Sequence, residues 1–119
     1  MKLVTAEFHQ AVGREAVVSA EAGHVFCLVE LEWPMLPEGR VRDVPKLEDG
    51  SGNSWTPHSA AETAWRAMQP GAKNPDMRPP VAAGDRETFI FSLEASAAAL
   101  GLYLRFAAPC EEAGEYPHL

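Results

Sequence analysis

The chain has 119 residues, which fits one domain able to bury roughly two-thirds of its unfolded surface. Seventeen acidic residues against ten basic ones give a net charge of −7, and no cluster of Lys and Arg is present, so a phosphate backbone would be repelled and no nucleic-acid partner is expected. No apolar run is long enough to span a hydrocarbon layer of about 30 Å, so no transmembrane segment is expected.

The N-terminal part predicts short β-strands. Residues 2–8 alternate in polarity and indicate a first strand, and the Val-rich residues 15–20 indicate a second. Residues 24–33 give the strongest pattern, because every second side chain is apolar: Val25, Cys27, Val29, Leu31 and Trp33. The opposite face begins with Phe26 and Leu28 and ends with Glu30 and Glu32. This strand should therefore start buried on both faces and end with one face in water.

The middle of the chain predicts a hairpin followed by a helix. Residues 41–48 form a strand that runs into the turn Asp-Gly-Ser-Gly-Asn at 49–53, and residues 54–56 return as its partner. Ser59 and Glu62 have the spacing of a capping box, with Ser59 as the cap of a short connecting helix that reaches about Met68.

The C-terminal part predicts the end of the fold. Residues 73–80 contain three prolines and indicate a loop. Residues 86–94 and 102–106 alternate in polarity and predict two further strands, joined by an Ala-rich connection. The expected fold is an all-β, antiparallel, immunoglobulin-like β-sandwich of about seven strands with one short helix. It should occupy residues 1–108, with an acidic, loosely ordered tail at 109–119.

Four stretches, taken in this order, resemble a known family. They are the Gly and long strand at 23–32, the Leu-Glu-Asp-Gly hairpin at 47–50, the turn and apolar strand at 81–91, and the Ala-containing turn and closing strand at 95–106. This order resembles bacterial immunoglobulin-like domains of unknown function, found in lipoproteins, secreted antigens and membrane-anchored envelope proteins. The resemblance implies an extracytoplasmic binding or structural module, and it supplies no catalytic residues.

The two cysteines leave two interpretations open. Cys27 lies on the apolar face of a central strand and Cys110 just after the last strand. A disulfide between them would contribute about 4 kcal/mol by the loop-entropy relation. Alternatively, Cys27 is a buried, inert thiol and Cys110 a free thiol in the tail. A catalytic role for Cys27 is not expected, because a nucleophile needs a partly exposed and electropositive setting.

Histidines and methionines give weak indications of metal binding. The histidines are His9, His24, His58 and His118. None has a spacing to another possible ligand that demands a metal, apart from His58 and Glu62 at i and i+4. Copper ligation by Met35, Met68 or Met77 with a histidine is less favoured than packing. Ser59, His58 and Glu62 could imitate a nucleophile, a base and an orienting group, but helix capping explains them without chemistry. We expect no metal, no cofactor and no catalytic residue.

The tryptophans are the best candidates for recognition, because large aromatic side chains dominate binding interfaces. Trp33 is expected in the core. Trp55 and Trp65 could line one exposed apolar patch with Met68 and bind a partner. Alternatively, both rings pack against the sandwich and close its end, which is the more favoured of the two readings.

Three functions fit these observations. The first is a non-enzymatic module of the bacterial cell envelope that binds another protein through Trp55, Trp65 and Met68 or through an exposed sheet edge. The second is a cytoplasmic interaction protein, such as an immunity protein or a small assembly subunit. The third is a periplasmic metal carrier. The first residues lack the apolar stretch of a signal peptide, so an extracytoplasmic location requires a leader that has been removed.

Overall fold

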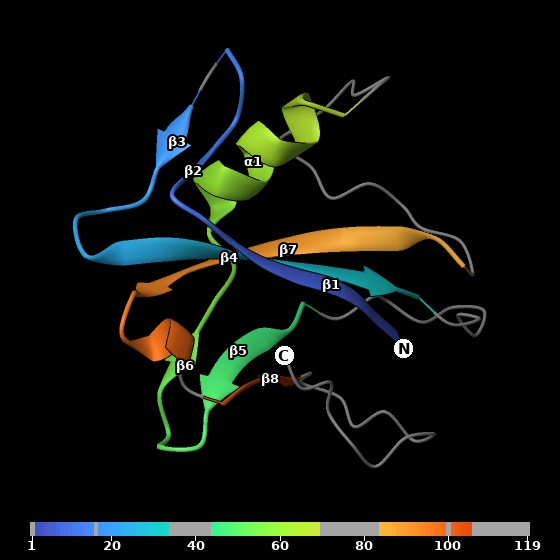
Figure 1. The fold of residues 1–119 in the computed structure, drawn as a ribbon. Helices are drawn as coiled ribbons and strands as arrows, with labels where there is room; N and C mark the ends of the chain where they lie inside the picture. The colour runs from blue at the N-terminus through green and yellow to red at the C-terminus, as the bar shows by residue number, and fades with distance from the viewer. Residues whose placement is uncertain (1, 16, 34–43, 70–83, 100, 106–119) are drawn as a thin grey trace.

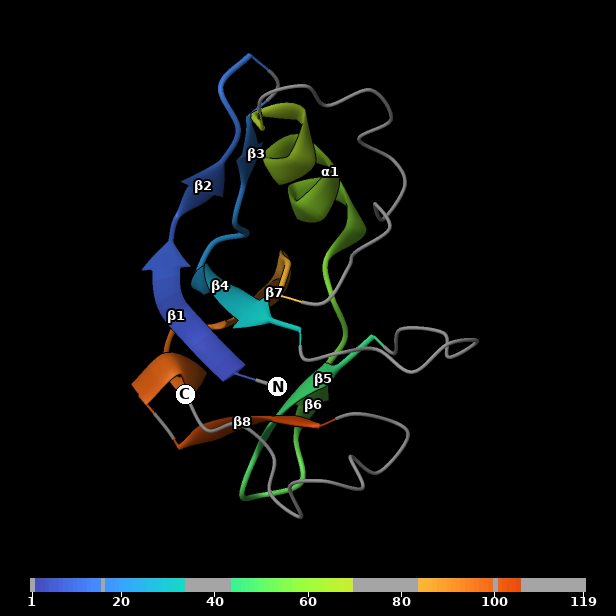
Figure 2. The ribbon, with the colours of Figure 1, turned by 90° about the vertical axis from the view of Figure 1, so that its right-hand side faces the viewer.

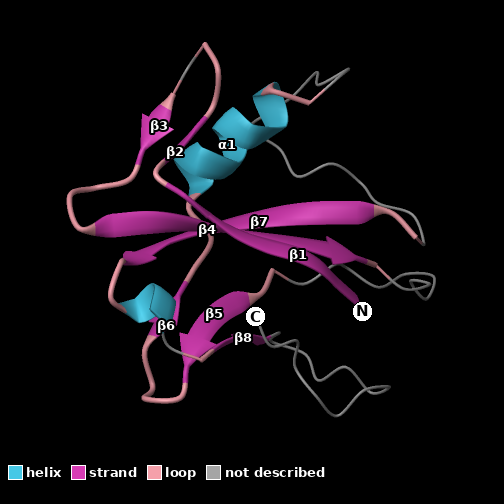
Figure 3. Ribbon diagram, viewed as in Figure 1, coloured by secondary structure: helices cyan, strands magenta, loops and turns pink. Residues whose placement is uncertain are grey.

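The computed structural model describes residues 2–15, 17–33, 44–69, 84–99 and 101–105. Within these residues the chain forms eight β-strands, one α-helix and one short 3₁₀ helix (Figures 1 and 3). In chain order they are β1 (Lys2–His9), β2 (Ala11–Val12), β3 (Val18–Ser19), β4 (His24–Glu32), β5 (Lys46–Asp49), β6 (Ser54–Trp55), α1 (Ser59–Ala67), β7 (Arg86–Glu94), η1 (Ala97–Ala99) and β8 (Leu102–Arg105). Every strand pair is antiparallel, so the all-β prediction with one helix is confirmed.

The elements are arranged in three layers (Figures 1 and 2). A central sheet has the order β1-β4-β7, and a second sheet has the order β6-β5-β8 and packs on one of its faces. The other face carries α1 and the hairpin β2–β3. β7 and β8 belong to different sheets, so the Ala-rich connection between them passes from one layer to the next.

The main core lies between the two sheets, and we call it the sandwich core. Alternate residues of β4 and β7 point into it and meet Leu47 of β5 and two leucines of β8. Its buried members are Val25, Cys27, Val29, Leu31, Trp33, Leu47, Phe89, Phe91, Leu93, Ala97, Leu102 and Leu104. The five residues predicted for the apolar face of residues 24–33 are all among them, which confirms that pattern and the core position of Trp33.

A smaller core lies on the opposite face of the central sheet, and we call it the helix-side core. Its buried members are Val12, Phe26, Leu28, Ala61, Ala64 and Ile90. Phe26 and Leu28 are buried, whereas Glu30 and Glu32 farther along β4 are half-buried. The predicted change from two buried faces to one is therefore confirmed, because Phe26 and Leu28 are the residues of β4 that belong to the helix-side core.

The helix begins one residue earlier than predicted. His58 is the N-cap, with φ −86° and ψ 105°, and its Nδ1 accepts the backbone N–H of Ala61 at 3.1 Å. Ser59 is the first helical residue, and the Glu62 carboxylate accepts the backbone N–H of Ile90. The predicted capping box with Ser59 as cap is therefore wrong, because contacts with β7 determine where this helix starts.

The two edges of the central sheet differ. Along β7, Pro57 forms an antiparallel bridge with Phe91, and the backbone oxygen of Ile90 accepts the N–H of His58 at 2.7 Å. Within the described part of the chain, no strand pairs with the outer edge of β1. The segment before α1 thus covers the middle of one edge of the sheet.

Several predicted segments lie partly or wholly outside the described residues. The predicted strand at 41–48 is seen only as β5, and the predicted strand at 15–20 is seen as the shorter β3. The loop at 73–80 and the tail at 109–119 are not described, so the predicted domain boundary stays a prediction. Among the described residues, none of the helices has the length and apolar character needed to cross a membrane.

Candidate functional site

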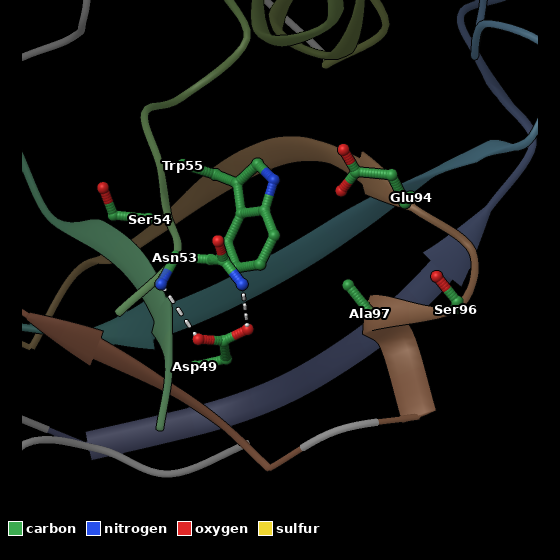
Figure 4. A pocket seen from close by; sticks show the side chains of 7 residues that line it. All are labelled: Asp49, Asn53, Ser54, Trp55, Glu94, Ser96 and Ala97. Carbon is green, nitrogen blue, oxygen red and sulfur yellow. Dashed lines mark hydrogen bonds between the residues drawn. The ribbon is translucent and has the colours of Figure 1, made fainter. Parts of the chain in front are cut away.

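A hollow of about 410 Å³ opens at the end of the sandwich (Figure 4). One wall comes from the β5–β6 hairpin and the other from the end of β7 and the start of η1. The residues that line it are Asp49, Asn53, Ser54, Trp55, Glu94, Ser96 and Ala97. We call it the Trp55 hollow, because its only aromatic lining residue is Trp55.

The hairpin wall is held by a buried carboxylate. Asp49 is the last residue of β5 and is almost fully buried, on the inward face that it shares with Leu47. Its Oδ1 accepts the backbone N–H groups of Ser51 (2.9 Å) and Asn53 (3.0 Å), and its Oδ2 accepts Nδ2 of Asn53 (2.9 Å). Gly52 supplies the positive φ of the turn, 94°. The turn is therefore fixed from within by one side chain.

These hydrogen bonds also keep Asp49 ionised. The side-chain donor of Asn53, followed by the backbone donors of the turn, lowers the pKa of Asp49 below its ordinary value, and burial opposes this only in part. Nδ2 of Asn53 points at Asp49, and no described residue donates a hydrogen bond to the amide oxygen of Asn53. The hairpin wall thus combines a fixed negative charge with a free acceptor.

Trp55 connects the hollow to the core. It pairs with Leu47 across the β5–β6 hairpin, is half-buried, and packs against the sandwich core. Its indole nitrogen is directed across the hollow toward the side of Glu94 (Figure 4). Within the described residues, no acceptor binds this N–H group. Trp55 therefore presents both apolar surface and an unused donor.

The facing wall is exposed and polar. Glu94 ends β7, with 59% of its side chain exposed, and its Oε1 lies 4.0 Å from Nε2 of His24 on the neighbouring strand. Ser96 adds an exposed hydroxyl group, and Ala97 belongs to the sandwich core. The ionisable residues that line the hollow, Asp49 and Glu94, are both acidic.

The structure separates the residues predicted to form one patch. Trp65 of α1 packs against the helix-side core, on the other face of the central sheet from Trp55. It borders a second, smaller hollow of about 230 Å³ with Arg66, Gln69 and residues of β4 and β7. Met68 is the half-buried C-cap of α1. Trp55 and Trp65 therefore do not share one apolar patch, although the binding role of each stays a prediction.

His58, Ser59 and Glu62 have structural partners. His58 Nδ1 accepts the N–H of Ala61, and its ring lies edge-on to Phe26 with centroids 5.3 Å apart. Glu62 is bound to the backbone of Ile90, and Ser59 is exposed. In the described part of the chain, no three His, Cys, Asp or Glu side chains form a group that could hold a metal ion. His118, Met35 and Met77 lie outside the described residues.

Cys27 is fully buried in the sandwich core, and no described residue is bonded to its sulfur. Burial raises the pKa of this thiol to about 12, so the thiolate form needed for nucleophilic attack is scarce. Cys110 lies outside the described residues, so the predicted bridge between the two is not tested.

Sequence reasoning found Trp55 but missed its neighbours in the hollow. An Asp and an Asn that bracket a Gly-containing turn indicate that side chains bond the turn backbone, so Asp49 and Asn53 had a readable signal. Glu94 and Ser96 had none, because about 40 residues separate them from the hairpin and only the packing of the two sheets brings them together.

No protein-family model and no curated protein matches this chain. Among solved structures, it is similar to a conserved hypothetical protein from Bacillus anthracis, with a TM-score of 0.64 and 16% sequence identity. The similarity covers 96% of this chain and 84% of that chain. At this level of identity the likeness is one of fold alone.

Proposed function

We propose that the protein is a non-enzymatic, immunoglobulin-like module of the bacterial cell envelope that binds another protein through the Trp55 hollow. The observation that carries the proposal is a half-buried tryptophan whose indole N–H has no acceptor among the described residues, beside a turn that Asp49 holds in place. Binding requires such a combination of apolar surface, directional polar groups and rigidity.

The position of the hollow supports this proposal. Sandwich folds commonly bind through the loops at one end, because the packed sheets hold these loops while leaving their side chains free. Here both sheets contribute: Asp49 and Trp55 come from one, and Glu94 from the other. The stretches that resemble the envelope family also fall on structural landmarks, because residues 23–32 contain β4 and the apolar part of 81–91 lies in β7.

Affinity capture from envelope extracts of the native host tests the proposal. The wild-type chain and two variants, Trp55→Ala and Trp65→Ala, serve as baits, and captured proteins are identified by mass spectrometry and then purified for titration. The same partner should bind the wild-type and Trp65→Ala baits and bind Trp55→Ala at least about tenfold more weakly. Equal affinity for the Trp55 and Trp65 variants would refute the role of the hollow, provided that both variants unfold cooperatively like the wild type.

The outer edge of β1 is the alternative binding surface. Phe8 lies on this strand with 46% of its surface exposed, and an unpaired edge can accept a strand from a partner. A Phe8→Glu bait distinguishes the two surfaces: capture lost with Phe8→Glu but kept with Trp55→Ala would assign binding to β1.

The compartment is tested through the cysteines. Alkylation of protein from its native host, before and after reduction, reports whether Cys27 and Cys110 are bridged. A bridge would support the envelope, because disulfides persist in oxidising compartments. Two free thiols would instead favour the cytoplasmic interaction protein.

A further inference from the structure

The Trp55 hollow has a charge and hydrogen-bonding character that defines what can enter it. Both of its ionisable lining residues, Asp49 and Glu94, are acidic, and the whole chain carries a net charge of −7. An anionic ligand would be repelled, and a neutral one would gain nothing from this field.

The free groups in the hollow are mainly acceptors. The Glu94 carboxylate is exposed, and no described residue donates a hydrogen bond to the amide oxygen of Asn53. The Ser54 and Ser96 hydroxyl groups can accept as well as donate, and the indole N–H of Trp55 is a donor only. A well-matched occupant must therefore supply several donors and a positive charge, together with one acceptor near the tryptophan.

We infer that the Trp55 hollow binds the side chain of an arginine on the partner protein, which rests on the protein-binding function proposed above. A guanidinium group has five donors and no acceptor, pairs with carboxylates in a fixed geometry, and packs its flat face on aromatic rings. The backbone carbonyl of the same arginine is the acceptor for the Trp55 N–H. Glu94 makes the direct ion pair, and Asp49, whose oxygens hold the turn, contributes its charge from the base of the hollow.

His24 is the one competing basic group near this ion pair that the structure identifies among the described residues. Its Nε2 lies 4.0 Å from Glu94 Oε1, so it engages one carboxylate oxygen only loosely. The other oxygen stays available to a guest, and 59% of the Glu94 side chain is open to solvent.

A short peptide, acetyl-Gly-Arg-Gly-amide, tests this inference by ¹⁵N NMR. The three tryptophans give three indole N–H signals, so Trp33 and Trp65 serve as controls within the same sample, and a Trp55→Phe variant assigns the third. The peptide should shift the Trp55 signal saturably and leave the Trp33 signal, whose N–H is bound to Glu87 Oε1 at 3.1 Å, unmoved. A Glu94→Gln variant should bind about tenfold more weakly, and Glu21→Gln, an exposed residue outside the hollow, should bind like the wild type.

Two results would overturn the inference. No saturable shift of the Trp55 signal, or the same affinity in Glu94→Gln as in the wild type, would exclude an arginine pocket. A methyl glucoside that shifts the Trp55 signal where the arginine peptide does not would assign the hollow to a neutral, hydroxyl-rich ligand instead. Capture of a purified partner that depends on Trp55 would still support the proposed function in either case, so the two failures are distinguishable.

Discussion

The two faces of the central sheet are covered in different ways. One face meets a second sheet over a broad apolar core that includes three phenylalanine or tryptophan side chains, Trp33, Phe89 and Phe91. The other meets a helix and a two-stranded hairpin over a small core in which two members are alanines, Ala61 and Ala64. Apolar area therefore dominates the sandwich side, because the hydrophobic contribution grows with the area removed from water.

On the helix side, polar contacts position α1 against the sheet. The Glu62 carboxylate accepts the N–H of Ile90, and the backbone N–H of His58 donates to the carbonyl of Ile90. The His58 ring caps the first turn of α1. Such bonds fix the position of a helix whose small side chains provide little apolar surface. The Trp55 hollow lies on the sandwich side. Substitutions on the helix side should therefore lower the stability of the fold without altering binding at the hollow.

A matched pair of leucines gives the largest expected difference between the two faces. Leu93 of β7 points into the sandwich core and Leu28 of β4 into the helix-side core, and both are buried. Leu93→Ala should lower the free energy of unfolding by about 4 kcal/mol and Leu28→Ala by about 2.5 kcal/mol, because a helix can move to fill a cavity more easily than a paired sheet can. Urea unfolding measures both, and equal losses would contradict the distinction.

The carboxylate of Glu62 gives the next largest effect. Glu62→Ala leaves the N–H of Ile90 without this acceptor in a buried setting and should cost about 2 kcal/mol. Glu62→Gln keeps an acceptor oxygen and should cost less than half as much. The same unfolding experiment tests both variants, and NMR titration of the arginine peptide should show unchanged affinity. A glutamine variant as unstable as the alanine variant would show that charge, rather than the hydrogen bond, is the important property.

Much of the fold could be predicted because alternation in polarity is a local property of a strand. Residues 86–94 were predicted as a strand with the bounds that β7 has, and residues 24–33 were predicted one residue longer than β4. In both strands the buried face depends on every second residue, so no knowledge of the neighbouring strands was needed.

The helix start and the hollow could not be predicted in the same way. The spacing of Ser59 and Glu62 indicates a capping box, yet Glu62 finds a better-placed donor in Ile90, 28 residues later in the chain. The hollow likewise depends on Glu94 lying opposite Trp55, which local patterns do not encode. Trp65 has the same residue type as Trp55 but lies in a different layer, so residue type alone did not identify the site.

The identity of the helix cap can be tested with three variants. His58→Ala removes the acceptor for the Ala61 N–H and should cost about 1 kcal/mol, whereas His58→Asn keeps a capping oxygen and should recover part of this loss. Ser59→Ala should be close to neutral, because Ser59 is already inside the helix. Thermal unfolding, followed by circular dichroism, measures the relative stability of the three variants. A Ser59→Ala variant less stable than His58→Ala would support the capping box predicted from the sequence.

The smallest expected effect belongs to Asp49, and it depends on pH. Hydrogen bonds from Asn53 and the turn hold the pKa of Asp49 below its ordinary value of 3.8, so its ionised form stabilises the folded state. This contribution is fully present above the pKa of the unfolded chain, and it is lost as the pH falls through the lower pKa of the folded protein. Asp49→Asn should therefore be less stable than the wild type at neutral pH, because its amide cannot accept all three hydrogen bonds.

The same Asp49→Asn variant should then lose less stability on acidification below about pH 4. Urea unfolding at several pH values measures this slope, with Glu21→Gln as a control in which an exposed acid is neutralised. A smaller loss for Asp49→Asn would show that the shape of the Trp55 hollow depends on a titratable turn as well as on apolar packing. If the free energy of unfolding changed with pH in the same way for Asp49→Asn and the wild type, the turn would instead keep its structure when Asp49 is protonated.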